Sequence, residues 1–318
     1  MSTFTEMQKL SEDFEQVGVY TVIVTADMLM PWLQFKGIDG NAYQYERELT
    51  NPQAASVDAE GELADTAMTF TSKSETLRDV YVQSPMNLKT VSLARKQDPL
   101  AILKVKMAKS YGRKLADLVV NGDSAVDALQ FDGLLKKARD ETRMLAMDDG
   151  ALDGPGTVET ELTLDRMHQA HDKVELGPSG EPQILIGNKT MRRKITSLMY
   201  ASGGGIELPS IDMFGRRVKT VDDVPYIVSD YLADDENYAD SSTWPSSTAT
   251  SLIFTSFGEE NEAFTLLHGP GGFFATEFQN LGKRKNKNEE VWRLIGYPGS
   301  VLYAPKTLCA LGGIDSTA

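Results

Sequence analysis

Hydrophobic residues recur at steps of three and four along one long segment of the chain. This period places them on one face of an α-helix, with lysine and arginine on the other faces. Asp98-Pro99 suits a helix start, and Asn121-Gly122 suits a helix end because both residues tolerate the left-handed conformation. The pattern therefore predicts one amphipathic helix over about 98–121. Its apolar positions are Leu100, Leu103, Met107, Tyr111, Leu115 and Leu118.

A different pattern, alternation, predicts an extended hairpin nearer the N-terminus. Tyr43 and Tyr45 stand two positions apart, and Met68 and Phe70 alternate with polar residues beyond a polar stretch at 49–66. So long a connection is uncommon in a compact domain, where it is either functional or without order. The strand-like flanks favour an arm that projects and orders against something else; a loose surface loop is the alternative. Its apolar residues are few, so we expect contacts from other chains to offset the entropy of ordering.

Further along, short apolar runs alternate with amphipathic segments. Ile184–Gly187 reads as a buried strand that leads into a helix at 189–200, and Ser251–Gly258 reads as another strand. The stretch from Glu289 to Gly313 reads as a long strand, a turn and a return to the core. The fold class predicted from these elements is mixed α+β.

Composition narrows the functional classes. The chain has 318 residues, 41% hydrophobic, and no apolar run approaches the roughly 20 residues that span a bilayer. The polar N-terminus does not resemble a secretory signal. One cysteine, Cys309, excludes an internal disulfide framework and a cysteine-based zinc cluster. A net charge of -14 argues against sequence-specific nucleic-acid binding unless basic residues gather on one face.

The candidate chemical motifs lack the context that catalysis requires. Gly122-Asp123-Ser124 follows a helix, whereas a nucleophilic serine needs a turn after a buried strand and a partner histidine. His168 and His171 lie three apart on a predicted helix, but no third metal ligand is apparent. The glycines at 203–205 lack the Lys-Ser/Thr of a phosphate loop. We therefore expect no catalytic residue, no metal site, no cofactor and no enzymatic activity.

The order of the remaining segments resembles the major capsid proteins of tailed bacteriophages, which share the HK97-like fold. The resemblance spans roughly 30–313. It rests on the long helix with VNGD and FDGLL after it, on ILIGNKTMRRKI, on FGRRV followed by DDVPYIVSDYL, and on SLIFTSFGEENEAFTLLHGPGG and VWRLIGYPGSVLYAPKTLCALGGI. No single motif is strict, but the ordered set is fairly specific.

The resemblance implies a division into an N-terminal arm at 1–30, an extended E-loop hairpin at 34–75, a P-domain at 76–123 and 286–318, and an A-domain at 124–285. In this reading the long helix is the spine of the P-domain, joined by strands near 76–93 and 286–305, and Asn121-Gly122-Asp123 marks the exit to the A-domain. The implied function is self-assembly through hexamers and pentamers into an icosahedral shell around a double-stranded DNA phage genome, in the virion.

The implied partners are further copies of the chain, a portal protein, a separate scaffolding protein and a decoration protein, with non-specific contact to packaged DNA and no membrane. The short arm departs from relatives that begin with a long scaffolding segment. Lys36 lies at the base of the hairpin and Lys73 near its end, and the tip contains no lysine, so the lysine cross-link of some relatives is not expected here. An encapsulin-like nanocompartment shell and a soluble mixed α/β enzyme are the alternative functions.

Charged residues of the hairpin and the long helix are the candidates for contact between subunits. Acidic side chains of the hairpin of one copy would pair with basic side chains of the long helix of the next. The acidic candidates are Glu46, Glu48, Glu60 and Glu62, and the basic candidates are Lys104, Lys109, Arg113 and Lys114.

Overall fold

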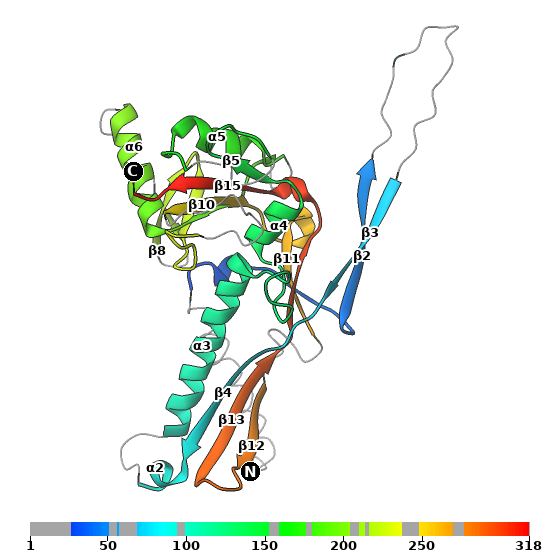
Figure 1. The fold of residues 1–318 in the computed structure, drawn as a ribbon, viewed down its shortest axis with the longest axis vertical. Helices are drawn as coiled ribbons and strands as arrows, with labels where there is room; N and C mark the ends of the chain where they lie inside the picture. The colour runs from blue at the N-terminus through cyan, green and yellow to red at the C-terminus, as the bar shows by residue number, and fades with distance from the viewer. Residues whose placement is uncertain are drawn as a thin grey trace, which may run out of the picture.

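The computed structural model describes most of the chain, and three parts are visible in it. An upper lobe holds a large sheet with helices, a lower part is built on one long helix and a narrow sheet, and a two-stranded hairpin points away from both (Figure 1). The described residues are 27–50, 56, 69–93, 99–152, 159–175, 180–203, 210–213, 216–236, 248–269 and 277–317.

The upper lobe is organised around a seven-stranded mixed sheet in the order β5-β15-β10-β6-β9-β8-β7. Helices α4, α5 and α6 accompany it. The bounds are β5 Met144–Ala146, β6 Ile184–Gly187, β7 Ser210–Met213, β8 Arg216–Val221, β9 Val224–Val228, β10 Ala249–Thr255, β15 Leu308–Asp315, α4 Leu134–Asp140, α5 Leu164–Asp172 and α6 Lys189–Gly203.

Both faces of this sheet are covered, which explains why its central strands read as continuous apolar runs. In β6, Ile184 and Ile186 belong to one core with residues of the long helix and α4. Leu185, which points to the opposite face, belongs to a second core with Met167 of α5 and Met191 of α6. The two cores together fix the sheet between helical layers.

The lower part is the long helix α3, Pro99–Asn121, packed against a narrow antiparallel sheet in the order β12-β13-β4. Met107, Tyr111 and Leu115 of α3 are buried, as the three- and four-residue spacing predicts. Asp98 lies outside the described residues, so the expected N-cap is not placed. The remaining bounds are β4 Val80–Asn87, α2 Leu88–Leu93, β12 Glu277–Lys283 and β13 Glu289–Gly296.

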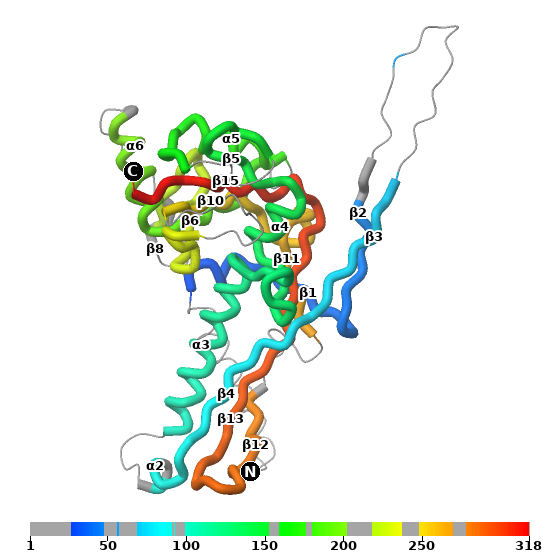
Figure 2. Tube along the Cα trace, in the orientation of Figure 1, coloured from blue at the N-terminus to red at the C-terminus, as the bar shows by residue number. Residues whose placement is uncertain are grey.

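A small sheet joins the three parts. In it β1 lies parallel to β11, and β14 lies antiparallel to β11 on the other side. The chain passes from β13 of the lower sheet into β14 of this small sheet, and from β1 into the hairpin, as the tube in Figure 2 shows. The bounds are η1 Met30–Trp32, β1 Phe35–Gly37, β11 Phe264–His268, β14 Pro298–Leu302, η3 Glu259–Asn261 and η5 Pro305–Thr307.

The end of α3 corrects one prediction. Neither Asn121 nor Gly122 has a positive φ, so the left-handed cap expected there is wrong. Glycine is required at 122 because a Cβ would lie 2.2 Å from the Phe131 carbonyl oxygen and 2.5 Å from that of Leu118. Gly133 packs against the same turn and donates its N–H to the Gly122 oxygen at 2.8 Å.

The strand pairing also corrects parts of the expected domain boundaries. β12, expected in the unit 124–285, pairs with β13 of the lower sheet, and β15, expected in the unit 286–318, lies between β5 and β10 of the upper sheet. Residues 88–93 form a helix rather than a strand. Residues 1–26 of the expected arm lie outside the described residues, and Leu29 and Met30 are already part of the main core. Pairing between distant strands is not visible in local periodicity, so the sequence could not supply it.

Candidate subunit-contact surfaces

The projecting hairpin has two chemically different faces. β2, Ala42–Thr50, pairs antiparallel with β3, Thr69–Thr76, in a register that sets Tyr45 opposite Lys73 and Glu46 opposite Ser72. Side chains alternate between exposed positions and buried or half-buried ones along β2 from Ala42 to Arg47 and along β3 from Phe70 to Thr76, while Thr69 at the start of β3 is exposed as well. Because successive strand residues point to opposite faces, one face turns toward the body and the other toward solvent. The confirmed hairpin is therefore a two-sided element.

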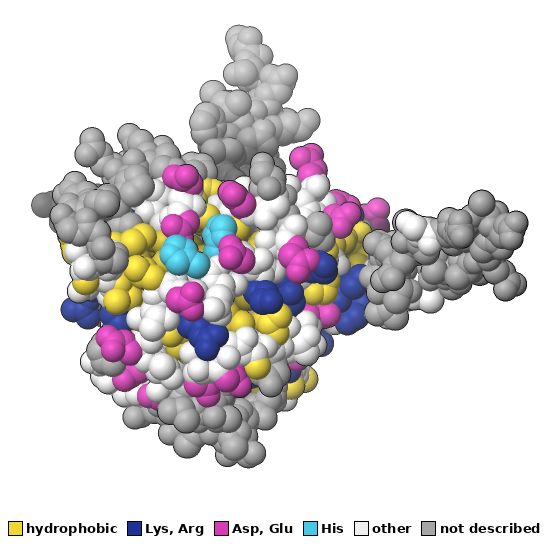
Figure 3. All heavy atoms as spheres, turned by 90° about the horizontal axis from the view of Figure 1, so that it is seen from above, with side chains coloured by type: hydrophobic (Ala, Val, Ile, Leu, Met, Phe, Trp, Pro, Cys, Tyr) yellow, Lys and Arg dark blue, Asp and Glu magenta, His cyan; other side chains and the backbone are white. Residues whose placement is uncertain are grey.

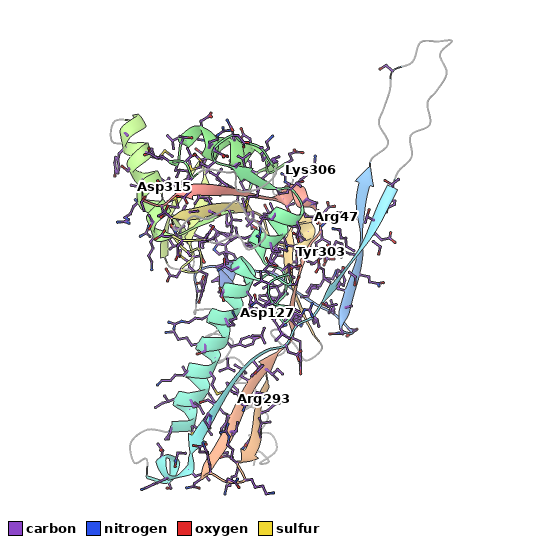
Figure 4. The ribbon with its side chains drawn as sticks, in the orientation of Figure 1. Arg47, Asp127, Arg293, Tyr303, Lys306 and Asp315 are labelled. Carbon is purple, nitrogen blue, oxygen red and sulfur yellow. The ribbon has the colours of Figure 1, made fainter. Side chains whose placement is uncertain are left out.

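The inner face is bound to the body by its own chain. The Tyr45 hydroxyl donates to the Leu302 carbonyl oxygen at 3.2 Å, and Arg47 donates to the carbonyl oxygens of Leu302 and Tyr303 at 2.6 and 2.8 Å. The rings of Tyr43 and Tyr45 stack, with centroids 6.0 Å apart, and both meet the Tyr303 ring edge-on. Figure 4 shows Arg47 and Tyr303 at this junction. The expectation that the hairpin depends on other chains for order is therefore wrong for its described base.

A set of ion pairs completes the base of the hairpin. Glu141, the residue that caps the C-terminus of α4, receives Arg47 at 2.7 Å and Lys73 at 3.0 Å. Lys137 of α4 pairs with Glu75 of β3. Local sequence does not indicate that these residues form a group, because α4 is distant in sequence from the hairpin; the one local signal is the alternation that places Arg47 on the face of the two tyrosines.

Partial burial changes the pKa values of two side chains at the base of the hairpin. Burial alone would raise the pKa of Glu141, but hydrogen bonds from Arg47 and Lys73 outweigh it and lower the pKa below its ordinary value of 4.5. Burial raises the pKa of the Tyr45 hydroxyl to about 12. At neutral pH the base of the hairpin therefore holds an ionised Glu141 and a protonated Tyr45.

The outer face of the hairpin carries the acidic candidates that the structure describes. Glu46 is exposed there, and Phe70, opposite Glu48 in the register, is 57% exposed. Glu48 lies in β2, but its side chain is outside the described residues, as are Glu60 and Glu62 in full.

The basic candidates all lie on α3, and two of them have partners in their own chain. The Lys104 ammonium lies 5.4 Å from the ring centre of Phe278 and 5.2 Å from that of Trp292, and Lys114 pairs with Asp117 at 2.8 Å. Lys109 and Arg113 are exposed and stand one helical turn apart, so they share a face. Ile102 and Val105, 39% and 52% exposed, continue this face toward the N-terminus of α3.

Charge is unevenly distributed over the chain. In the helices and strands of the lower part, with the turn between β12 and β13, basic residues clearly outnumber acidic ones, although the whole chain carries -14. The excess of acid therefore lies elsewhere, and Figure 3 shows acidic side chains spread over the top of the upper lobe. The charged residues of the lower part are Lys89, Lys104, Lys106, Lys109, Arg113, Lys114, Lys283, Arg284, Lys285, Lys287 and Arg293, against Asp117, Glu277, Glu289 and Glu290.

The residues considered for chemistry have structural contacts. Asp123 is buried and pairs with Arg139 at 2.8 Å, so the Gly-Asp-Ser segment is tied to α4. His168 of α5 lies 2.9 Å from an oxygen of Asp222, while the His171 ring meets Phe254 edge-on. Across the described residues, no group of three or more His, Cys, Asp or Glu side chains is arranged to hold a metal ion.

Comparison with known proteins matches this architecture to one family. The model of the phage capsid family matches residues 19–243. The chain belongs to the phage capsid family. It is thus a major capsid protein, a structural component of the virion that self-associates into an icosahedral shell and is not an enzyme. A search of curated proteins gave no match.

Solved shells share the HK97-like fold of this capsid protein at low sequence identity. The holo-SrpI encapsulin complex of Synechococcus elongatus PCC 7942 matches with a TM-score of 0.68 and 14% identity, over 91% of this chain and 88% of that one. The capsid of a native GTA particle matches with a TM-score of 0.62 and 12% identity, over 91% and 90%. Mycobacterium phage Adephagia matches with a TM-score of 0.59 and 16% identity, over 90% and 89%.

The encapsulin likeness concerns the fold alone, and the family model favours the phage capsid over the nanocompartment alternative. None of the helices in the described ranges has the length and apolar character that crossing a membrane would take.

Proposed function

We propose that the capsid protein builds its shell by laying the outer face of the hairpin of one copy across the exposed face of α3 in the next copy. Alternation along the described part of the hairpin carries this proposal, because it exposes the described side chains of one face, among them Glu46 and Phe70, to solvent. Glu46 would meet Lys109 and Arg113, and Phe70 would pack on Ile102 and Val105. Opposite charges and apolar residues then match in the same contact.

In this proposal the hairpin acts as the E-loop, the lower part as the P-domain, and the upper lobe as the A-domain that converges at the centres of hexamers and pentamers. Glu48, Glu60 and Glu62 would extend the acidic contact, and Lys104 and Lys114 would lie at its edge, since both already have partners within the chain. Many weak contacts suffice in a closed shell because each is multiplied by symmetry.

The partners proposed beyond further copies are a portal protein, a separate scaffolding protein and a decoration protein. Double-stranded DNA inside the shell would be held only by non-specific, counterion-mediated contact. The basic lower part is the region of the chain best suited to such contact, because phosphate attracts clustered lysine and arginine.

Charge reversal tests the proposed contact. Glu46→Lys should slow shell formation, measured by light scattering and electron microscopy, while circular dichroism of the free subunit stays unchanged. Lys109→Glu should restore assembly in the Glu46→Lys background if the two residues meet. Glu260→Lys is the matched control, since Glu260 is also exposed but lies on η3, outside the hairpin. Normal assembly of Glu46→Lys would refute the pairing.

A second arm addresses residues beyond the described hairpin. The double change Glu60→Lys and Glu62→Lys should impair assembly and leave the folding of the subunit intact. Hollow shells in electron micrographs of the wild-type protein provide the reference. Normal shells from the doubly changed chain would remove Glu60 and Glu62 from the proposal.

A further inference from the structure

The base of the hairpin contains a carboxylate whose position is unfavourable without its partners. Glu141 is the C-terminal capping residue of α4, where the helix dipole presents partial negative charge. Its side chain is only 19% exposed, so water compensates little for that repulsion. A residue that conflicts with its local structure needs a compensating role elsewhere. In this chain the compensation comes from the hairpin.

Glu141 binds both strands of the hairpin at once. One carboxylate oxygen meets Arg47 of β2 at 2.7 Å, and the other meets Lys73 of β3 at 3.0 Å. A bond to a single strand would leave the hairpin free to turn about that strand. Two bonds on opposite strands, together with the Lys137–Glu75 pair farther along β3, remove that freedom.

Other contacts at the base of the hairpin hold it to a second element of the body. Arg47 reaches past Glu141 to the carbonyl oxygens of Leu302 and Tyr303, at the end of β14. α4 lies beside β15 of the seven-stranded sheet, whereas β14 belongs to the three-stranded sheet, so Arg47 connects the hairpin to two different elements of the body. Arginine suits this role because its planar group donates several hydrogen bonds in fixed directions.

We propose that Glu141 is the positioning residue of the hairpin: it sets the direction in which the hairpin leaves the body in the free subunit, before a second copy binds. This inference rests on the proposed function, in which the outer face of the hairpin is the contact surface. Pre-orientation lowers the entropy lost at assembly, because the neighbour then meets a hairpin already in its bound direction.

The test measures hairpin direction in free subunits of the full chain. Spin labels at Ser72→Cys on the outer face of β3 and Ser197→Cys on α6 report the distance between hairpin and upper lobe; both positions are exposed. The native Cys309 is buried and stays unlabelled. The wild-type background should give a single narrow distance distribution, and Glu141→Gln should give a broad or two-peaked one.

Two further variants separate positioning from general stability. Glu175→Gln removes the carboxylate paired with Lys306, away from the hairpin, and should leave the distribution narrow. Lys73→Met removes one of the two strands' bonds from a side chain that is 41% exposed, so it should fold and broaden the distribution to an intermediate degree. Circular dichroism of each variant confirms an intact body.

Assembly gives the second readout. Glu141→Gln should slow shell formation by about tenfold, which corresponds to about 1.4 kcal/mol of lost pre-orientation. A broad distribution in the wild-type free subunit, or a narrow one in Glu141→Gln, overturns the inference. The distance measurement needs no shell, so failure of the docking contact in the charge-reversal experiment is recognised separately from failure of the positioning role.

Discussion

Replacing Gly122 distinguishes two physical reasons for a glycine at the end of α3. A Cβ at this position would meet the carbonyl oxygens of Phe131 at 2.2 Å and Leu118 at 2.5 Å, and both are backbone atoms. Relief would require moving a segment closed by two hydrogen bonds, from the Gly122 N–H to Leu118 at 2.9 Å and from the Gly133 N–H to Gly122 at 2.8 Å. The backbone at 122 has no positive φ, so strain of that kind is absent.

The expected loss for Gly122→Ala follows from these contacts. Overpacking costs about 1–3 kcal/mol, and weakening two backbone hydrogen bonds costs about 1 kcal/mol each. Reduced freedom of the unfolded chain returns about 0.5–1 kcal/mol. The free energy of unfolding should therefore fall by about 2–4 kcal/mol, measured by denaturant titration of the free subunit.

Asparagine supplies the discriminating comparison, because it tolerates the left-handed conformation better than alanine. At Gly122, asparagine should destabilise at least as much as alanine, since it adds still more atoms near Phe131. At the control position Gly282, φ is +82° and nothing lies within 4 Å of the added Cβ, so asparagine should be tolerated better than alanine. If asparagine were better tolerated than alanine at Gly122 as well, the close-approach explanation would be refuted.

Three further outcomes follow from protonation and charge. The pKa of Glu141 is lower in the folded chain than in the unfolded one, so the contribution of Glu141 to stability is present above pH 4.5 and is lost as the pH falls through the folded-state pKa. The spin-label distance distribution should therefore broaden in acid, and Glu141→Gln should abolish that change. Burial raises the pKa of the Cys309 thiol to about 12, so a maleimide should label it only after denaturant is added. The rate of assembly, followed by light scattering, should pass through a maximum at intermediate salt, and a steady rise or fall would contradict this.

Local patterns in the sequence are sufficient to predict individual helices and strands: the long helix, the buried strand and the hairpin. The spacing from Leu100 to Leu118 predicts α3, and its bounds agree with the structure apart from the undescribed Asp98. Ile184–Gly187 is the predicted buried strand, and the alternation around Tyr43 and Tyr45 predicts the hairpin. In each case the signal is a period that matches a helix or a strand, and burial then follows the same period.

These local patterns do not predict contacts between segments that are distant in the sequence. Nothing near Glu141 in the sequence indicates that it meets Arg47 and Lys73, because the contact depends on how the hairpin folds back over α4. The same reason hides the pairing of β15 with β10. The exposure of Glu46 agrees with the alternation along β2. The partners of Lys104 depend on tertiary packing, and the partner of Lys114 is its helical neighbour Asp117.

The expected salt maximum arises because attraction and repulsion act over different ranges in this chain. At about 0.01 M salt, charges interact over about 30 Å, so each subunit feels the net charge of the next and repulsion slows their approach. At about 0.1 M the range is about 10 Å, and the proposed contact of Glu46 with Lys109 and Arg113 outweighs the screened net charge. Near 1 M the range is about 3 Å, and these exposed pairs are weakened too. The Glu46→Lys variant lacks the local attraction, so its rate should rise steadily as repulsion is screened, and a maximum retained in that variant would assign the attraction to other residues.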